Sequence, residues 1–300
     1  MPCFRPLKAV KVSGGVSFDL RADGSPIDLP CGRCQGCRLE HSRQWAVRCV
    51  HESKSHVVNC VVTLTYDNEH LPKDGNLCYA DFQRFMKRLR KWSPVPIRYF
   101  VCGEYGELNK RPHFHAALFG FDFLDKKLCL TSEAGSSQYS SQVLDKLWPL
   151  SRPGRSTVGE ADFNSFAYIA RYAMQKLNGA IAHVRGTDRV DLRTGEILPL
   201  VPEFIHMSLK PGIGRMWVDR FGDSDVFPFD RVVMNGHESK PPRYYDKVLK
   251  AKDPERFKQI QFDREDRALL HPEESTARRL EARETVTLAR LRKFRREFEA

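Results

Sequence analysis

The chain has 300 residues, of which 41% are hydrophobic and 29% charged, and its formal net charge is +11. This composition supports a buried core and excludes a wholly disordered chain. No apolar run approaches the roughly 20 residues of a membrane helix, and the first residues lack the apolar segment of a signal peptide. We therefore expect a protein of the reducing cytoplasm with no membrane association. The excess of Lys and Arg favours a polyanionic partner, nucleic acid before acidic lipid.

Three cysteines recur at every third position near the N-terminus: Cys31, Cys34 and Cys37 in the segment PCGRCQGC. Glycines in the intervening turns let several thiolates point at one ion, and a tetrahedral zinc site needs a fourth ligand. Cys3 is our first choice for that ligand. The alternatives are Cys49, His41 and His51. An iron–sulfur cluster and three unliganded thiols are the competing interpretations.

The residues after this motif alternate between helical and strand patterns. We expect a helix over 38–52, a buried strand over 57–66 and a second strand over 97–105. Between the strands, Asp81 is expected to cap a helix that ends at Ser93. The core face of this helix has apolar residues at i, i+3, i+4 and i+7: Phe82, Phe85, Met86 and Leu89. Its other face is basic, which fits either a solvated surface or DNA contact: Arg84, Lys87, Arg88 and Lys91.

The segment 111–120, RPHFHAALFG, is typical of a β-strand, and we expect it to form an antiparallel hairpin with the strand before it. His113 and His115 are two residues apart, so they share one face of the strand. Alone, the pair fits a half-buried sheet face as well as a metal site. A carboxylate carried across the hairpin would favour the metal site. Glu104 is the preferred third ligand and Glu107 the alternative.

Shorter patterns follow the histidine strand. We expect a loop or insertion over 121–141, a short helix over 142–148, and a basic loop over 152–157 that suits either phosphate contact or solvent. Further on, the sequence predicts a strand over 204–209 and a glycine turn before another helix. Residues 253–300 are predicted to form charged helices that begin with Asp253 as an N-cap.

A second informative helix is predicted over 162–177, capped by Asp162. One stripe of this helix is apolar and belongs to a core: Phe163, Phe166, Ala167, Ala170, Ala173, Met174 and Leu177. Tyr168, Tyr172 and Lys176 lie at i, i+4 and i+8 on a different stripe. They fit either a solvated edge, or two nucleophiles with a cation that holds a phosphate or lowers the pKa of a phenol.

These pieces together fit phosphoryl transfer. A divalent ion held by two histidines and a glutamate leaves positions open for phosphate oxygens, and a tyrosine can supply the attacking oxygen. Attack by tyrosine on a phosphodiester conserves the bond energy in a covalent phosphotyrosine. Two tyrosines one helical turn apart could act in succession, one cleaving and one rejoining the strand.

The order of strand, histidine hairpin and tyrosine helix resembles that of the HUH endonucleases of rolling-circle replication. Four segments are similar, more closely, to the replication initiators of gokushovirus-like Microviridae, which are small single-stranded DNA phages: PCGRCQGC, VVTLTYDNEHLP, YFVCGEYGELNKRPHFHAALFG and YIARYAMQKL. The resemblance covers roughly residues 28–220. It implies a protein of the host bacterial cytoplasm that nicks viral origin DNA, single-stranded or locally melted. The protein would stay joined to the 5′ phosphate, leave a 3′ hydroxyl for the host replication machinery and later rejoin the strand.

By the same resemblance, His113 and His115 are ligands of Mg²⁺ or Mn²⁺, and Tyr168 and Tyr172 are nucleophiles. Glu104 as third ligand and Lys176 as helper rest on spacing more than on the family pattern. A non-catalytic zinc-knuckle nucleic-acid-binding protein is the alternative. A non-haem iron oxygenase also uses two histidines and a carboxylate, but it would leave the tyrosine pair and the net charge unexplained.

The expected architecture is α+β, with a central antiparallel sheet, flanking helices and the tyrosine helix over the metal face. We expect three parts: a Cys-rich segment with a zinc knuckle over 1–52, an endonuclease core over 53–235, and a charged helical extension over 236–300. Single-stranded DNA is expected to lie across the sheet on basic and aromatic residues.

Overall fold

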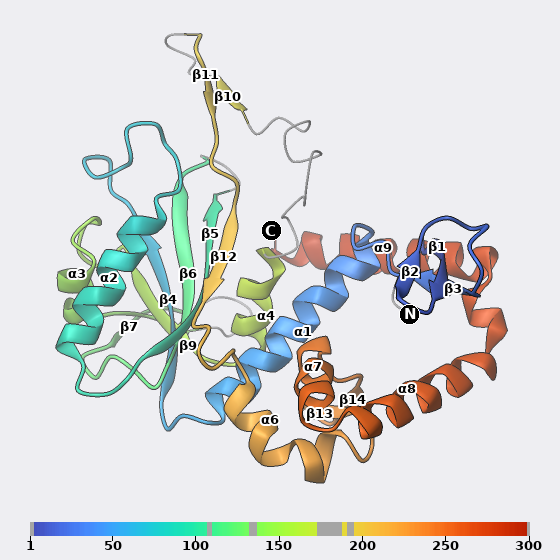
Figure 1. Cartoon of the computed structure of the whole chain (residues 1–300). Coiled ribbons are helices and arrows are strands. Elements are labelled where there is room, and N and C mark those ends of the chain that lie inside the picture. The colour runs from blue at the N-terminus through green and yellow to red at the C-terminus, as the bar shows by residue number, and fades with distance from the viewer. Residues whose placement is uncertain (1–2, 107–109, 132–136, 173–187, 191–194, 299–300) are drawn as a thin grey trace. The chain divides into compact units, whose positions relative to one another are not determined.

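The computed structural model describes residues 3–106, 110–131, 137–172, 188–190 and 195–298 (Figure 1). Contacts between residues divide the chain into two compact units. The larger unit comprises residues 42–245, and the smaller comprises 1–41 together with 246–300. Helix α1 (Gln35–Ser53) contributes residues to both units. In the part of the chain that the structure describes, no helix is long and apolar enough to cross a bilayer.

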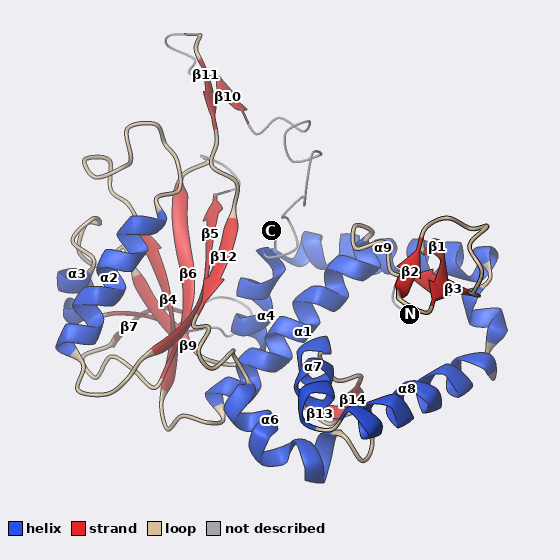
Figure 2. Cartoon of the chain, viewed as in Figure 1, coloured by secondary structure: helices blue, strands red, loops and turns tan. Residues whose placement is uncertain are grey.

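The larger unit is built on a seven-stranded sheet with the strand order β12-β5-β6-β4-β9-β8-β7, in which every neighbouring pair is antiparallel (Figure 2). Its strands, in chain order, are β4 (Asn59–Thr65), β5 (Arg98–Tyr105), β6 (Pro112–Phe119), β7 (Lys127–Thr131), β8 (Ser137–Ser140), β9 (Thr157–Glu160) and β12 (Phe204–Met207). The predicted α+β class, the antiparallel sheet and the hairpin of β5 with β6 are confirmed.

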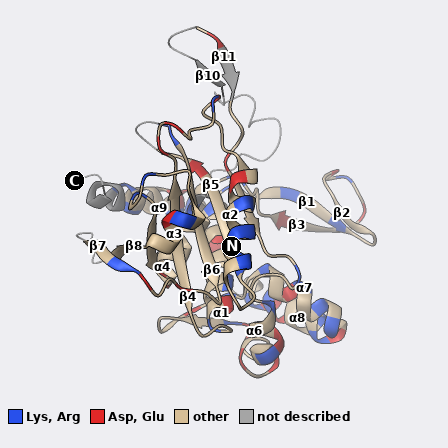
Figure 3. Cartoon of the chain, turned by 90° about the vertical axis from the view of Figure 1, so that its left-hand side faces the viewer, with Lys and Arg blue, Asp and Glu red and all other residues tan. Residues whose placement is uncertain are grey.

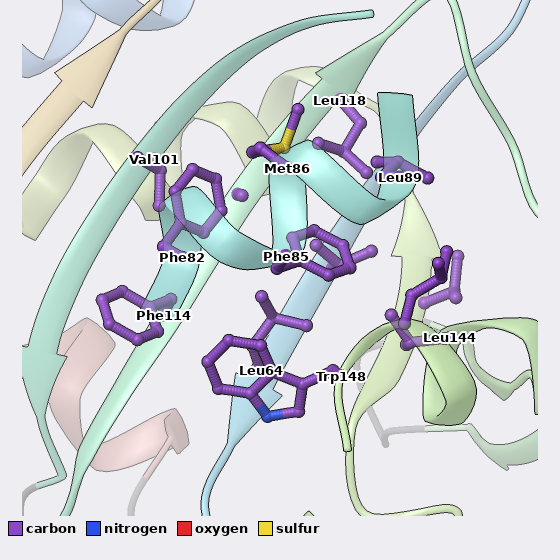
Figure 4. Packing of buried hydrophobic residues seen from close by; sticks show 14 of the residues in the cluster. Leu64, Phe82, Phe85, Met86, Leu89, Val101, Phe114, Leu118, Leu144 and Trp148 are labelled. Atoms are coloured by element: carbon purple, nitrogen blue, oxygen red, sulfur yellow. The ribbon is translucent and has the colours of Figure 1, made fainter. Parts of the chain in front are cut away.

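One face of this sheet is covered by α2 (Tyr79–Trp92) and α3 (Gln142–Leu147). Figure 4 shows the predicted core residues of α2 packed against side chains of β4 and β6. Leu64 and Phe114 come from these strands, and Trp148 closes the cluster beyond α3. The indole Nε1 of Trp148 donates a hydrogen bond to the carbonyl oxygen of Thr65 at 2.6 Å, so this buried polar group is satisfied.

The opposite face of the sheet is covered by α1 and α4 (Phe163–Tyr172), on the other side from α2 (Figure 1). Because side chains alternate along a strand, Val61 and Phe119 point to this face while their neighbours point to α2. Phe166 and Ala170 of α4 are buried here, as predicted. Ile169, which is not part of the predicted stripe, is also buried. The two faces therefore hold two separate cores.

A polar and aromatic cluster joins α1 to α6 (Arg215–Phe221), which follows the predicted glycine turn. His51 stacks on Trp217 with ring centroids 3.5 Å apart, and its Nδ1 lies 2.7 Å from the hydroxyl of Tyr245. Gly214 has a φ of 77°, and a Cβ there would lie 2.9 Å from the same hydroxyl. Glycine is needed here for both its backbone conformation and its lack of a side chain. The π-helical turn η1 (Gly222–Val226) continues α6.

Two short hairpins complete the described part of the larger unit: β10 (Asp188–Val190) with β11 (Ile197–Pro199), and β13 (Val232–Met234) with β14 (His237–Ser239). Helix α7 (Arg243–Lys252) begins in this unit.

The smaller unit contains a three-stranded sheet and charged helices. The sheet has the order β2-β1-β3, from β1 (Leu7–Val12), β2 (Gly15–Ser17) and β3 (Ser25–Leu29). The helical part is α8 (Pro254–Leu269), the short turn η2 (Pro272–Ser275) and α9 (Ala277–Phe298). The side chain of Asp253 caps α8 by accepting a hydrogen bond from the N–H of Arg256, as predicted. The small sheet was not predicted.

Two other sequence-based expectations are wrong. The segment 121–141, expected as a loop or insertion, contains β7 and β8, which extend the main sheet. Asp81 does not cap α2, because the helix already begins at Tyr79. Its carboxylate is instead buried, where it accepts a hydrogen bond from the hydroxyl of Tyr66 at 2.8 Å and pairs with Arg84.

Candidate active site

The register of three strands brings the candidate metal ligands together. Glu104 of β5 is paired directly with His113 of β6, and Thr63 of β4 is paired with His115. Directly paired residues of an antiparallel sheet project to the same face. His115 alternates with the α2-facing Phe114, so it lies on the face that α4 covers. The hairpin predicted from sequence thus carries the Glu104 carboxylate to the two imidazoles.

The three side chains converge on a small volume. Oε1 of Glu104 lies 2.6 Å from Nε2 of His113 and 3.1 Å from Nε2 of His115. The candidate ligand atoms of these three residues all lie within 4.8 Å of one another. Glu104 and His115 are buried, and His113 is partly buried. These are the three preferred ligands predicted from the sequence.

The other ring nitrogens have partners that orient the imidazoles. Nδ1 of His113 lies 3.1 Å from the carbonyl oxygen of Arg111, which can only accept, so Nδ1 carries the proton. Nδ1 of His115 lies 2.9 Å from Oγ1 of Thr63, which can accept in the same way. A protonated imidazole here donates its Nε2–H to Oε1 of Glu104. In a neutral ring with the proton on Nδ1, the Nε2 lone pair faces the carboxylate and is available to bind a cation.

The site perturbs the titration of all three residues. Burial alone would raise the pKa of Glu104, but hydrogen bonds and charge from both histidines outweigh it and lower the pKa. Burial alone would lower the pKa of His113, and the Glu104 carboxylate outweighs it, so this pKa is raised. For His115 burial dominates, and its pKa is lowered. A lowered pKa keeps His115 neutral, which is the form that binds metals.

One atom of the cluster is left over. Oε2 of Glu104 is buried and has no hydrogen-bond partner among the described residues. A buried carboxylate oxygen without a partner is costly, and a bound cation would satisfy it. Two imidazoles and a carboxylate suit Mn²⁺ well and are also compatible with Mg²⁺. The residues present therefore fit a divalent ion.

Helix α4 places a tyrosine beside this cluster. Its first turn is fixed by Asp162, whose Oδ1 accepts the N–H of Ser165 at 2.7 Å, and whose own N–H is bound by the Ser165 hydroxyl. Phe166 and Ile169 dock the helix on the sheet. Tyr168, on another stripe, is 41% exposed, and its ring is edge-on to His115 with centroids 5.1 Å apart.

Not every predicted site residue can be located. Tyr172 is the last residue of α4, but its side chain lies outside the described part of the structure. Lys176 and Glu107 also lie outside the described residues. At this site, then, the structure brings together His113, His115, Glu104 and Tyr168.

Two residues of the site were not predicted from the sequence. Thr63 orients His115, and Glu203 places a second carboxylate nearby, where its Oε1 accepts the N–H of Tyr105 at 3.1 Å. The pKa of Glu203 is raised by burial and by the charge of Glu104. Polar threonines inside an otherwise apolar strand were a usable signal for Thr63. Glu203 directly precedes β12, and no pattern in the sequence indicates that β12 pairs with β5.

The cysteine motif forms a second cluster, in the smaller unit. The Sγ atoms of Cys3, Cys31, Cys34 and Cys37 all lie within 4.8 Å of one another. Cys49 is instead buried in the core beneath α4, and His51 packs against Trp217. Among the fourth ligands considered from sequence, the structure thus brings Cys3 to the other three thiols.

Comparison with known proteins places the chain in a family. Residues 59–177 match the family described as replication-associated protein ORF2/G2P. The replication-associated protein VP4 of Bdellovibrio phage phiMH2K is 33% identical over 269 residues, which cover 86% of this chain and 80% of that protein. The replication-associated protein ORF2 of Spiroplasma virus 4 is 29% identical, over 83% of this chain and 80% of its own length.

A third relative is the replication-associated protein ORF4 of Chlamydia phage 1, which is 34% identical over 74% of this chain and 53% of its own length. No solved structure matches the chain significantly. The matched family segment begins with β4 and includes the β5–β6 hairpin and α4, which carry the candidate site. The chain therefore belongs to the family of phage replication-associated proteins.

Proposed function

We propose that this protein initiates rolling-circle replication by nicking viral origin DNA, with Tyr168 as the attacking nucleophile. The observation that carries the proposal is the position of the Tyr168 ring, edge-on to His115 and beside the cluster of His113, His115 and Glu104. A phenol next to a cluster that can hold a divalent ion suits tyrosine attack on a phosphodiester.

The proposed reaction is a transesterification. The phenol oxygen of Tyr168 attacks the scissile phosphorus as it loses its proton, and the bond from phosphorus to the 3′ oxygen breaks. The leaving 3′ oxygen takes up a proton and becomes a 3′ hydroxyl, and the 5′ phosphate stays on the tyrosine. Rejoining is the reverse: a 3′ hydroxyl attacks the phosphotyrosine, and the tyrosine recovers its proton. Each step exchanges one phosphate ester for another.

His113, His115 and Glu104 would hold the divalent ion, Mg²⁺ or Mn²⁺. When bound, such an ion supplies charge that polarises a non-bridging phosphate oxygen. Thr63 and the carbonyl of Arg111 keep the two imidazoles in the orientation that ligation needs. The partly buried site also restricts water, which would otherwise compete with the tyrosine.

The predicted basic loop over 152–157 suits contact with the phosphates next to the cut. Oγ1 of Thr65, which is paired with His113, lies 3.2 Å from the hydroxyl of Ser151. Ser151 directly precedes the loop, so the loop lies at the histidine end of the sheet. Arg152 and Arg155 of this loop are exposed. Because helices cover both faces of the central strands, we place single-stranded DNA along the rim of the site and not across the sheet.

The test is a covalent adduct on a denaturing gel. Single-stranded oligonucleotides that tile the phage genome, labelled on the 3′ side, are incubated with the protein and Mn²⁺. We expect one oligonucleotide to yield a labelled protein band together with a released 3′-hydroxyl fragment. Tyr168→Phe should lose the adduct, whereas the matched control Tyr139→Phe, in β8, should keep it.

The second candidate function is DNA binding without catalysis, with His113 and His115 as structural residues. It predicts shifted bands on native gels with every divalent ion and no adduct from any oligonucleotide. That result, obtained with protein that binds the same DNA, would contradict the nicking proposal.

A further inference from the structure

We propose that Cys3, Cys31, Cys34 and Cys37 together bind one Zn²⁺, which is a structural ion of the smaller unit and separate from the divalent ion of the active site. The nicking chemistry makes no use of these cysteines. All four belong to residues 1–41 of the smaller unit, whereas the candidate active site lies within the larger one. The inference therefore stands independently of the proposed function.

The distances between the sulfurs fit a single tetrahedral ion. Sγ of Cys34 lies 3.9 Å from Sγ of Cys3, and Sγ of Cys31 lies 4.0 Å from Sγ of Cys37. Four thiolates bound at about 2.3 Å around one tetrahedral zinc lie about 3.8 Å from each other. None of the four cysteines is in a disulfide. In an iron–sulfur cluster the cysteines bind two or more irons, so the four sulfurs do not all lie this close together.

Backbone N–H groups point at the sulfurs, as they do where thiolates carry negative charge. The N–H of Cys31 donates to Sγ of Cys3 at 3.3 Å, and the N–H of Cys34 donates to Sγ of Cys31 at 3.3 Å. The N–H of Phe4 donates to Sγ of Cys34 at 3.4 Å. The contact of Cys34 with Cys31 lies within the turn between them, and the other two join the segment of Cys3 and Phe4 to that turn. Gly32 adopts a φ of 74° there, a conformation that favours glycine and tightens the turn.

The ion would have a structural role because the sheet of this unit is small. Its strands have six, three and five residues, and a sheet of this size is marginal without a covering core or a staple. Ligation joins Cys3 to the turn that precedes α1, and so closes a loop around the whole sheet. In a small unit of this kind the free energy of zinc binding becomes free energy of folding.

Cys3 also anchors residues that contact the C-terminal helix. Phe4 and Leu280 of α9 are both buried, and they line the same pocket. Arg5 forms an ion pair with Glu284 at 3.3 Å, although a pair this exposed contributes little stability. We infer that the ion fixes the segment directly before β1, on which α9 packs. Loss of the ion should therefore loosen α9 as well as the small sheet.

The first test is the metal content of the full-length protein, purified under reducing conditions without chelator and measured by mass spectrometry of the elements. We expect close to one zinc per chain that survives dialysis against a weak chelator. Cys34→Ser should lose this zinc, because a serine hydroxyl is not a thiolate. Cys129→Ser is the matched control, since Cys129 is exposed on β7 of the larger unit, and it should keep the zinc.

A second measurement covers the case in which Cys34→Ser fails to fold. The wild-type chain is stripped of metal, kept reduced and titrated with Co²⁺. Four thiolates should give an intense sulfur-to-cobalt charge-transfer band together with strong visible bands of tetrahedral cobalt, saturating at one ion per chain and displaced by Zn²⁺. Limited proteolysis should cleave within α9 faster in the stripped protein than in the zinc-loaded one.

Several outcomes would overturn the proposal. One is iron in place of zinc, and another is purified protein that lacks zinc and whose four thiols react freely. Equal zinc content in wild type and Cys34→Ser, or a cobalt spectrum without the charge-transfer band, would also overturn it. Zinc lost equally from Cys129→Ser would also count against these four ligands. The charge-transfer band requires sulfur, so cobalt bound at the histidine site cannot be mistaken for it.

Discussion

The ring of Tyr168 is edge-on to the imidazole of His115, with centroids 5.1 Å apart and ring planes at 89°. The two residues come from different elements, α4 and β6, and are held together by the apolar packing of α4 on the sheet. His115 in turn shares the carboxylate oxygen of Glu104 with His113. One short chain of contacts therefore links the proposed nucleophile to the proposed metal ligands.

Thr63→Val should weaken binding of the catalytic ion without removing it. The change keeps the shape of the side chain but deletes the hydroxyl that orients His115. Loss of such a partner typically weakens metal binding by about ten-fold or more. We expect the Mn²⁺ concentration for half-maximal adduct formation to rise by about that factor, with a near-normal rate at saturation. Thr63→Ser should restore the wild-type value.

The matched control for this change is Thr131→Val, on the exposed strand β7. It should leave the Mn²⁺ dependence unaltered. An unchanged Mn²⁺ dependence for Thr63→Val would show that Thr63 does not position His115.

Removing the positive charges of the basic loop should change the salt dependence of DNA binding. Replacing Arg152 and Arg155 with alanine should weaken binding of single-stranded DNA and make it less sensitive to salt. For a single strand, the slope of log K against log salt becomes shallower by about 0.7 for each phosphate that the protein no longer neutralises. Fluorescence anisotropy with a labelled oligonucleotide over a range of salt concentrations measures both effects.

The control for the loop variant removes two positive charges from α2 instead. Lys and Arg lie on the outer side of this helix (Figure 3), and Lys87 and Lys91 are both exposed there. The double change Lys87→Ala and Lys91→Ala should have the smaller effect if this face is only solvated. A larger effect than that of the loop variant would move the DNA to α2 and contradict the proposed path.

Acidification should destabilise the larger unit through His51. Burial lowers the pKa of this imidazole to about 3, and the unfolded chain has a value near 6.5. Between these values the unfolded state binds one proton more than the folded state, so stability falls as the pH falls. From pH 7 to pH 5 the loss from this one residue is about 2 kcal/mol. Urea unfolding at several pH values measures it.

The variant that isolates this effect is His51→Phe. It keeps a ring against Trp217 but cannot bind a proton, and it cannot form a hydrogen bond with Tyr245. It should be less stable than wild type at pH 7 and show a weaker loss of stability toward pH 5. A pH dependence equal to that of wild type would exclude His51 as its source.

Local patterns predicted most of the elements that build the site. The continuous apolar run over 114–119 and the i, i+3, i+4 spacing of α2 both reflect burial in the core, and both correspond to observed elements. Asp162 and Asp253 have the sequence context of N-caps and act as such. Asp81 has the same context, yet its carboxylate is used by Tyr66 and Arg84, which are tertiary partners that a local pattern does not contain.

Long-range pairing accounts for what the sequence could not predict. Strand β7 is exposed along its whole length, so it has no apolar alternation to reveal it. Glu203 reaches the site only because β12 pairs with β5 across about a hundred residues of chain, and Thr63 reaches His115 only through the register of β4 with β6. Glu104 was predictable because the hairpin is local and its two strands are nearly consecutive.

The most direct test of the proposed mechanism is to identify the residue that carries the DNA after the first cut. Trypsin cleaves after Arg171 and so separates the two tyrosines into the peptides Ser156–Arg171 and Tyr172–Lys176. The adduct is trapped at short reaction times, digested with nuclease and trypsin, and analysed by mass spectrometry. We predict the nucleotide mass on Tyr168, in the first peptide. A nucleotide found only on Tyr172, or on a residue outside both peptides, would contradict Tyr168 as the first nucleophile.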